Sequence, residues 1–332
     1  LIVLVLSTSA AQAHRDFPKG FKWCVATSAH QIEGGNTHSD WWAWEQLPGK
    51  IKNGERSGAA CDHWNRLTED TKLLRELNVT QYRFSVEWAK IEPSPGQWDE
   101  AALAHYRDEI ELLIANGIEP MVTLHHFTLP LWLAERGGWA WEGAPKAFAA
   151  YARKVYQSVG APVRDWITLN EPMVVLLGAY VSGQLPPGLK DMNAVVEPLM
   201  NMVRAHGLAY RALHEESKTV RVGIAHHLRV FDPDTIFNPI LSYVVPKLDA
   251  AFNWSFGKAC ETGHLTLSVP LGVSVDEFIP EAVGTQDFIG LNYYTRDMVA
   301  INTTSSPLGL EFIANEQSPH SDLGWEIYPY GF

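Results

Sequence analysis

The sequence contains few cysteines, and none of them forms a metal-binding pattern. Cys24, Cys61 and Cys260 are the only three among 332 residues, and neither a C-x-x-C motif nor a histidine pair at metal-ligand spacing is present. Three widely spaced cysteines allow at most one disulfide, so we expect them to be small buried apolar side chains. We expect no metal and no cofactor.

Positive charge is also scarce. Lys and Arg number 26 against 38 Asp and Glu, which gives a net charge of −12. Without a basic block or an arginine-rich stripe, this balance argues against a nucleic-acid partner. It mildly disfavours an anionic substrate. The composition is otherwise globular, with 46% hydrophobic residues, and it includes 13 Trp, whose flat faces suit both cores and sugar rings.

The first residues resemble an export signal. An apolar run at residues 1–6 is followed by Ser-Thr-Ser and by Ala11-Gln12-Ala13, a small-x-small cleavage site. The run is too short to span a bilayer. We expect residues 1–13 to be a signal peptide, incomplete at its start, that is cleaved before His14. The mature protein would then be secreted or periplasmic, with no membrane association, and its barrel would occupy residues 14–332. The alternative is a buried first strand.

Apolar, β-rich runs alternate with helical patterns along the rest of the chain. Strands are predicted at 21–26, 79–86, 119–124, 165–169, 220–225 and 288–293. Helical patterns are predicted at 61–77, from Asp99 to Asn116, and at 144–159, 194–216 and 238–260. Six strands, each followed by a helix, indicate a parallel α/β fold.

Polar side chains gather where each predicted strand ends. They are Gln31 and Glu33, Arg83 and Glu87, His125 and His126, Asn170 and Glu171, His226 and His227, and Asn292 and Tyr294. A (β/α)₈ TIM barrel builds its active site at that rim from several strands. A doubly wound sheet would concentrate its site at one switch point and usually carry a Gly-rich first turn, which is absent. The pattern favours the barrel, with about six of its eight units in this chain.

Glu171 lies in the segment Thr168-Leu169-Asn170-Glu171-Pro172, where the fourth strand meets its loop. The pentapeptide alone fits a solvated loop glutamate as well as a catalytic one. Here the sequence closely resembles the family 1 glycoside hydrolases of the β-glucosidase type, from Phe17 to Phe332. The resemblance is carried by T-x-N-E-P at 168–172, FKW at 21–23, ATSAHQIEG at 26–34, YRFSVEW at 82–88, TLHHF at 123–127, LP at 129–130, GGW at 137–139, DFIGLNYY at 287–294 and GWEIYP at 324–329.

The resemblance implies a retaining exo-β-glycosidase, most simply a β-glucosidase, with a small β-glycoside as its substrate. Glu171 would be the acid/base, and its pKa would have to be raised for it to stay protonated. A second carboxylate, the nucleophile, would lie roughly 5–5.5 Å away. Asn170 matches the position that binds the 2-hydroxyl of the sugar. Gln31 and His126 match positions that bind its outer hydroxyls.

Three further residues match positions that support the nucleophile, namely Arg83, Asn292 and Tyr294. Each has a simpler alternative. Glu87 could neutralise Arg83 inside the barrel, His126 could be a core histidine, and Tyr294 could be ordinary packing. The resemblance assigns no role to His226 or His227, which we interpret as structural or rim residues.

Two departures from the family pattern stand out. Phe127-Thr128 replaces the common Trp-Asp, which leaves the sugar preference open, and Cys24 replaces a usual Gly. The family's nucleophile motif, T-E-N-G, does not occur, and the chain ends at Gly331-Phe332. We therefore expect a C-terminally truncated barrel whose 332 residues alone are inactive. Two alternatives remain: a non-catalytic sugar-binding protein on the same barrel, and a 6-phospho-β-glycosidase.

Overall fold

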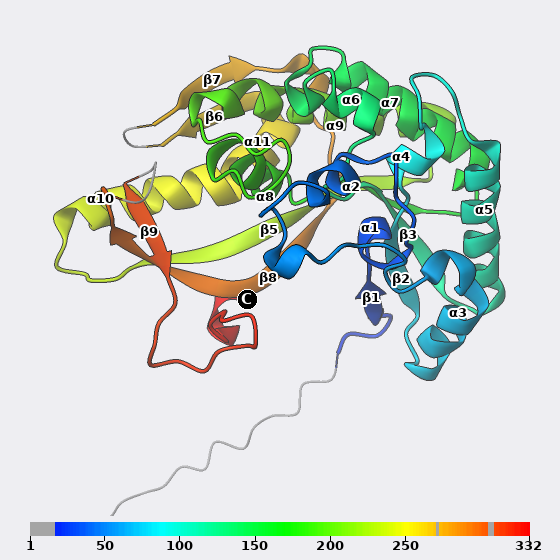
Figure 1. Ribbon diagram of the computed structural model, residues 1–332, viewed down its shortest axis with the longest axis horizontal. Coiled ribbons are helices and arrows are strands. Elements are labelled where there is room, and N and C mark those ends of the chain that lie inside the picture. The colour runs from blue at the N-terminus through cyan, green and yellow to red at the C-terminus, as the bar shows by residue number, and fades with distance from the viewer. Residues whose placement is uncertain (1–16, 270–271, 305–308) are drawn as a thin grey trace, which may run out of the picture.

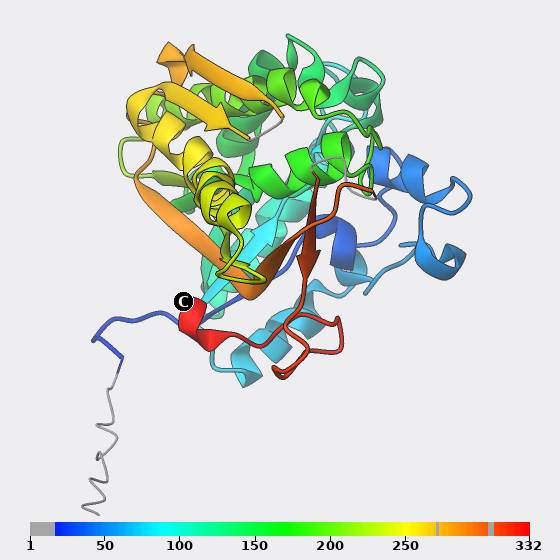
Figure 2. The same ribbon diagram turned by 90° about the vertical axis from the view of Figure 1, so that its left-hand side faces the viewer.

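A curled sheet forms the centre of the molecule (Figures 1 and 2). The computed structural model describes residues 17–269, 272–304 and 309–332, so the expected signal peptide lies outside the described residues. The strand order is β1-β2-β3-β4-β5-β8-β9, in which the first six strands are parallel and β9 is antiparallel to β8. The strands are β1 (Cys24–Ala26), β2 (Gln81–Ser85), β3 (Glu119–His125), β4 (Asp165–Asn170), β5 (Arg221–Pro233), β8 (Phe288–Ile301) and β9 (Leu310–Ile313). The prediction of a partial (β/α)₈ barrel is confirmed.

Helices cover the convex side of this sheet (Figure 1). The longer ones are α3 (Leu67–Glu76), α5 (Glu100–Ala115), α7 (Ala144–Val155), α9 (Val196–Glu216), α10 (Pro239–Asp249) and α11 (Ser255–Thr262). Short helices sit in the loops at the strand ends: α1 (Ala29–Ile32), α2 (Asp40–Glu45), α4 (Trp88–Ile91), α6 (Leu131–Ala134) and α8 (Pro172–Leu176). Single π-helical turns follow α7, α8 and α10, at η4 (Tyr156–Gly160), η5 (Leu177–Val181) and η7 (Ala250–Trp254).

The boundaries of α5 and the buried face of α7 follow directly from the sequence. The carboxylate of Asp99 accepts hydrogen bonds from the backbone N–H groups of Ala101 and Ala102, which caps α5 as predicted. In α7 the buried side chains include Phe148, Tyr151, Ala152 and Val155. This spacing of three and four residues puts them on one face, which packs against the core.

The middle parallel strands, β2 to β5, are mostly buried, as expected of a sheet covered by helices on its outer side, whereas β1 and β8 are largely half-buried or exposed. Every residue of β2 and β4 is buried. The core also contains three of the tryptophans, Trp88, Trp139 and Trp166, each with no more than 1% of its surface exposed. Most of the energy of this fold therefore comes from apolar burial along the barrel wall, which holds the polar ends of the strands in place.

Three features differ from the prediction. The sixth strand, β8, is followed by the antiparallel strand β9 and not by a helix. A second sheet, the hairpin of β6 (His264–Ser268) and β7 (Ser274–Phe278), was not predicted. β5 and β8 run past their predicted ends and stay paired as far as Pro233 and Val299. The extra paired residues of β5 and β8 lie beyond the apolar barrel wall. Because they do not belong to the apolar runs that predicted the two strands, the hydrophobic pattern of the sequence could not predict that they are paired.

The cysteines only partly match the expectation. All three are free, and Cys260 is buried, but Cys24 and Cys61 are exposed. No helix among the described residues is long and apolar enough to cross a membrane.

Candidate active site

Glu171 stands at the carboxyl-terminal end of β4, and local geometry aims it into the barrel mouth. The β4–β5 register shifts between Ile167 and Asn170, an irregularity of the kind that redirects side chains next to functional sites. Glu171 itself has φ +49°, a left-handed conformation that is uncommon outside glycine. Its backbone N–H donates to the carbonyl of Ala225 on β5 at 2.7 Å, and Pro172 begins α8 immediately after it.

Glu171 is only 6% exposed, and side chains from β8 and β5 hold its carboxylate. Asn292 Nδ2 donates to Oε1 at 2.6 Å, and the Tyr294 hydroxyl donates to the same oxygen at 3.3 Å. The other oxygen, Oε2, lies 3.7 Å from Nδ1 of His227. The sequence therefore places the candidate acid correctly at the rim, and three side chains from two other strands surround it.

These contacts set the charge of Glu171. Burial raises its pKa, but the contact with His227 and the hydrogen bond from Asn292 outweigh burial and hold the pKa below its usual value. The expectation of a raised pKa is therefore not met in this chain. The physical reason is that hydrogen-bond donors surround the carboxylate and favour its ionised form. The expected rise in pKa depended in part on a second carboxylate beside Glu171.

Asn170, 1% exposed, links Glu171 to the barrel interior. Its Oδ1 accepts hydrogen bonds from Arg83 Nη2 at 2.5 Å and from Asn292 Nδ2 at 3.2 Å, and its Nδ2 lies 3.2 Å from His126 Nε2. Arg83 is also bonded to the Thr123 hydroxyl at 3.0 Å. Burial and the nearby Arg83 charge lower the pKa of His126 to about 3, so its imidazole is neutral.

Two other predicted site residues sit differently. Gln31 lies on α1 with its side chain exposed. Phe127, which replaces the usual Trp, has φ +75°, and its ring centroid lies 5.2 Å from that of His126. Thr128 beside it is buried, and its hydroxyl donates to both carboxylate oxygens of Glu87 at 3.0 and 2.9 Å.

The suggested Arg83–Glu87 pair is wrong. β2 ends at Ser85, so the alternation that would put both side chains on one face stops before Glu87. Glu87 instead caps α4, where its carboxylate accepts from the Ala89 N–H, and burial together with the charge of Glu33 raises its pKa to about 7.

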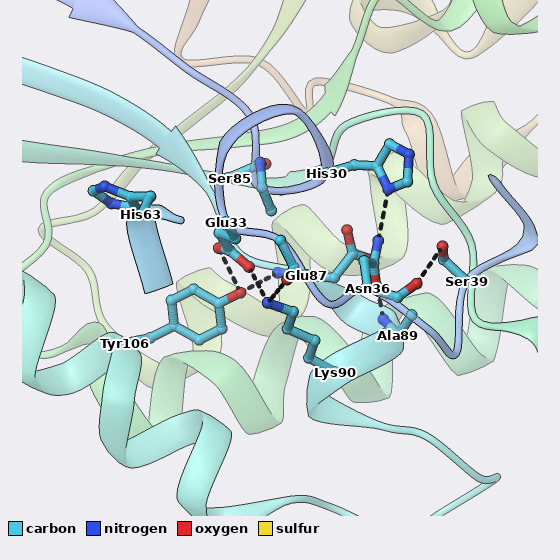
Figure 3. Close-up of polar contacts among 12 residues, drawn as sticks. His30, Glu33, Asn36, Ser39, His63, Ser85, Glu87, Ala89, Lys90 and Tyr106 are labelled. Atoms are coloured by element: carbon cyan, nitrogen blue, oxygen red, sulfur yellow. Dashed lines mark hydrogen bonds and ion pairs between the residues drawn. The ribbon is translucent and has the colours of Figure 1, made fainter. Parts of the chain in front are cut away.

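Two further glutamates near the rim are also engaged elsewhere. Glu33 accepts from the Tyr106 hydroxyl at 2.9 Å and pairs with Lys90 at 2.9 Å, and both side chains point at it in Figure 3. Glu326 pairs with Arg296 at 2.7 Å. Glu171 is the one carboxylate among the described residues that accepts hydrogen bonds from Asn292 and Tyr294. Arg83 donates instead to Thr123 and Asn170.

The geometry of the strand ends agrees with the comparisons to known proteins. A family model described as Glycosyl hydrolase family 1 matches residues 13–263. The chain belongs to glycosyl hydrolase family 1.

Relatives in this family include β-glucosidase A of Thermotoga maritima, which is 32% identical over an alignment that covers 96% of this chain and 73% of that protein. Among solved structures, a family 1 β-glucosidase from Thermotoga maritima superposes with a TM-score of 0.86 at 32% identity and covers 95% of this chain and 73% of its own. A β-glycosidase from Pyrococcus horikoshii gives a TM-score of 0.85 at 36% identity, with coverage of 95% and 71%. The chain is thus a glycosidase of family 1, and it spans about three quarters of these relatives.

His227 is the residue of this family 1 site that sequence reasoning missed. It is 4% exposed, and the register of the β5–β8 pair sets it opposite Asn292. His226, its neighbour, faces the other way, where the backbone of Asn253 and Phe252 lies beside its ring. The available signal was strand alternation, which sends one of two adjacent histidines to the barrel interior, but the sequence could not show which one.

Proposed function

We propose that this chain carries the acid/base half of a retaining exo-β-glycosidase active site, of the β-glucosidase type. The observation that supports this most is the Glu171 carboxylate, held at the rim by Asn292 and Tyr294 and joined through Asn292 to the Asn170–Arg83 network. In this proposal Glu171 protonates the leaving oxygen and later takes a proton from water. Asn170, His126 and Gln31 bind the sugar hydroxyls.

The nucleophile in this proposal is a glutamate outside the 332 residues. Arg83, Asn292 and Tyr294 would then serve two carboxylates, since Asn292 and Tyr294 already touch Glu171 and Arg83 lies within reach of its charge. A cationic Arg83 beside the attacking carboxylate would favour its ionised form. The structures of Thermotoga maritima β-glucosidase in complex with castanospermine and with deoxynojirimycin support a small sugar-like ligand for this site.

The acid role is tested by leaving-group dependence in a longer chain from the same gene that includes the nucleophile. General acid catalysis contributes roughly 10²–10⁴-fold, and an activated aryl leaving group hardly needs it. Glu171→Gln should therefore slow a disaccharide or alkyl β-glucoside far more than an activated aryl β-glucoside. Equal losses on both substrates would remove Glu171 from the acid role.

Two outcomes would favour the alternative functions. A longer chain that binds a β-glucoside but has no carboxylate on its seventh strand would be a sugar-binding protein. Preferential hydrolysis of a 6-phospho-β-glucoside over the plain glucoside would indicate the phosphoglycosidase. We further propose export with cleavage before His14, and mass spectrometry of the secreted protein tests this, because retention of residues 1–13 would contradict it.

A further inference from the structure

The two oxygens of the Glu171 carboxylate are in different environments. Oε1 accepts two hydrogen bonds, from Asn292 and Tyr294. Oε2 lies 3.7 Å from Nδ1 of His227, which is too long for a hydrogen bond but short enough for an ion pair. Oε1 is therefore already occupied by donors, and His227 is the side chain next to the other oxygen.

His227 is itself incompletely bonded. Neither of its ring nitrogens has a hydrogen-bond partner among the described residues, although the residue is only 4% exposed. A buried polar group without a partner is costly, so such groups are rare and usually have a reason to be there. The ring is held edge-on between the aromatic rings of Tyr294 and Phe252, with centroids 5.1 and 5.9 Å away. Its nitrogen is thus aimed at Glu171 by packing.

We propose that His227 is a positioning residue that holds Oε2 of Glu171 through Nδ1–H, as Asn292 holds Oε1. The proposal rests on the acid/base role of Glu171 proposed above. When Glu171 gives its proton to the leaving oxygen, the electron pair of the broken C–O bond goes to that oxygen. The carboxylate left behind is then stabilised at both oxygens, by the hydrogen bonds to Oε1 and by the nearby Nδ1–H of His227 at Oε2, and His227 keeps its own proton.

By holding Oε2, His227 makes Glu171 a stronger acid and fixes the plane of its carboxylate. A donor to the ionised form favours that form, so His227 lowers the affinity of Glu171 for its proton. The direction agrees with the lowered pKa of Glu171, to which His227 contributes. The other titratable or charged groups whose charge acts on this pair are Arg83, His126, Tyr294 and Asp297, and Arg229 pairs with Asp297. His226 is coupled to the pair by charge, although its ring points away from Glu171.

The test substitutes His227 and follows the titration of the Glu171 carboxyl carbon by NMR in the 332-residue chain labelled with ¹³C-glutamate. The Glu171→Gln spectrum assigns the signal. His227→Leu removes the donor and should move the Glu171 titration midpoint to higher pH. His227→Asn should restore the midpoint, because the asparagine amide nitrogen, like Nδ1 of histidine, is attached to Cγ. His227→Gln places its nitrogen one atom further out and should not restore it.

His226→Leu is the matched control, because that ring points away from Glu171, and it should leave the midpoint unchanged. An unchanged midpoint in His227→Leu, or an equal shift in His226→Leu, would overturn the proposal. If His227→Leu fails to fold by circular dichroism, the comparison of His227→Asn with His227→Gln decides in the same way. The readout is independent of turnover. If Glu171→Gln spares substrates with poor leaving groups, the proposed function fails, yet the titration still reports whether His227 acts on Glu171.

Discussion

His227 and Asn292 are register partners on β5 and β8, and they approach opposite oxygens of the Glu171 carboxylate. Because the two strands stay paired beyond the barrel wall, the positions of these side chains relative to each other are set by the backbone ladder. Glu171 reaches them from β4 through its left-handed φ of +49°. The surroundings of the Glu171 carboxylate are therefore built from three neighbouring strands.

Asn292 should be the stronger of the two side-chain donors to Oε1. Its hydrogen bond is 2.6 Å long, whereas that of the Tyr294 hydroxyl is 3.3 Å. We expect Asn292→Leu to raise the pKa of Glu171, because the ionised carboxylate loses its shortest hydrogen bond. Tyr294→Phe is the control and should move it less. Carbon-13 titration of Glu171 measures both, and a larger effect of Tyr294→Phe would contradict this ranking.

The 332-residue chain alone should not hydrolyse β-glucosides at a useful rate. Its three other candidate carboxylates, Glu33, Glu87 and Glu326, are bound to Lys90, Thr128 and Arg296, so none is placed to attack a sugar beside Glu171. Without a nucleophile, double displacement has no covalent intermediate. The assay is release of an aryl aglycone by purified, monodisperse protein. Robust turnover that disappears in Glu171→Ala would show that a second carboxylate does act here.

Asp40 should make the protein less stable as the pH rises. Burial, reinforced by the charge of Glu87, raises the pKa of Asp40 to about 8, against backbone hydrogen bonds from Leu129 and Trp41 that lower it. The folded state thus keeps a proton that the unfolded state releases. The resulting stabilisation is complete below pH ~4, the range of a free Asp, and is lost as the pH rises through about 8.

Asp40→Asn should remove this part of the pH dependence, because the amide oxygen can still accept from Leu129 and Trp41 but cannot ionise. Urea unfolding between pH 4 and pH 9 measures it, with the variant gaining stability relative to the original chain at the alkaline end. Asp99→Asn, the same change at the exposed cap of α5, should leave the slope unaltered. An identical slope in Asp40→Asn and the original chain would refute the assignment.

His63 should contribute a second alkaline loss of stability. Its imidazole bridges α3 and α5 through Asp70 at 2.6 Å and Glu109 at 3.3 Å. Burial lowers the pKa of His63, but these two carboxylates outweigh it and raise the value to about 9. The stabilisation is fully present below the ordinary histidine value of roughly 6.5 and is lost as the pH rises through about 9.

We expect His63→Gln to cost roughly 3–5 kcal/mol near neutral pH, because it leaves the buried Glu109 without its cation. The comparable change at the more exposed His214, which pairs with Asp287 at 2.9 Å, should cost at most about 1 kcal/mol. Denaturant midpoints of the two variants at pH 7 and pH 9.5 measure both effects. A His63→Gln penalty that stays equally large at pH 9.5 would show that packing, and not charge, holds α3 to α5.

The sequence by itself determined the six parallel strands, most of their helices and the polar rim at the strand ends. Alternating apolar runs and helical spacing report burial, and the structure buries most of strands β2 to β5 and one face of its longer helices. The cap at Asp99 and the place of Glu171 at the end of β4 could be predicted because both follow from a few adjacent residues.

Tertiary structure alone decided which rim side chains meet. Glu87 turns to Thr128 and not to Arg83, because β2 ends two residues earlier and a helix begins there. His227 and not His226 faces Glu171, because the register of β5 against β8 sets it beside Asn292. Such contacts join residues far apart in the sequence, and their geometry depends on strand register and backbone direction, neither of which leaves a local pattern in the chain.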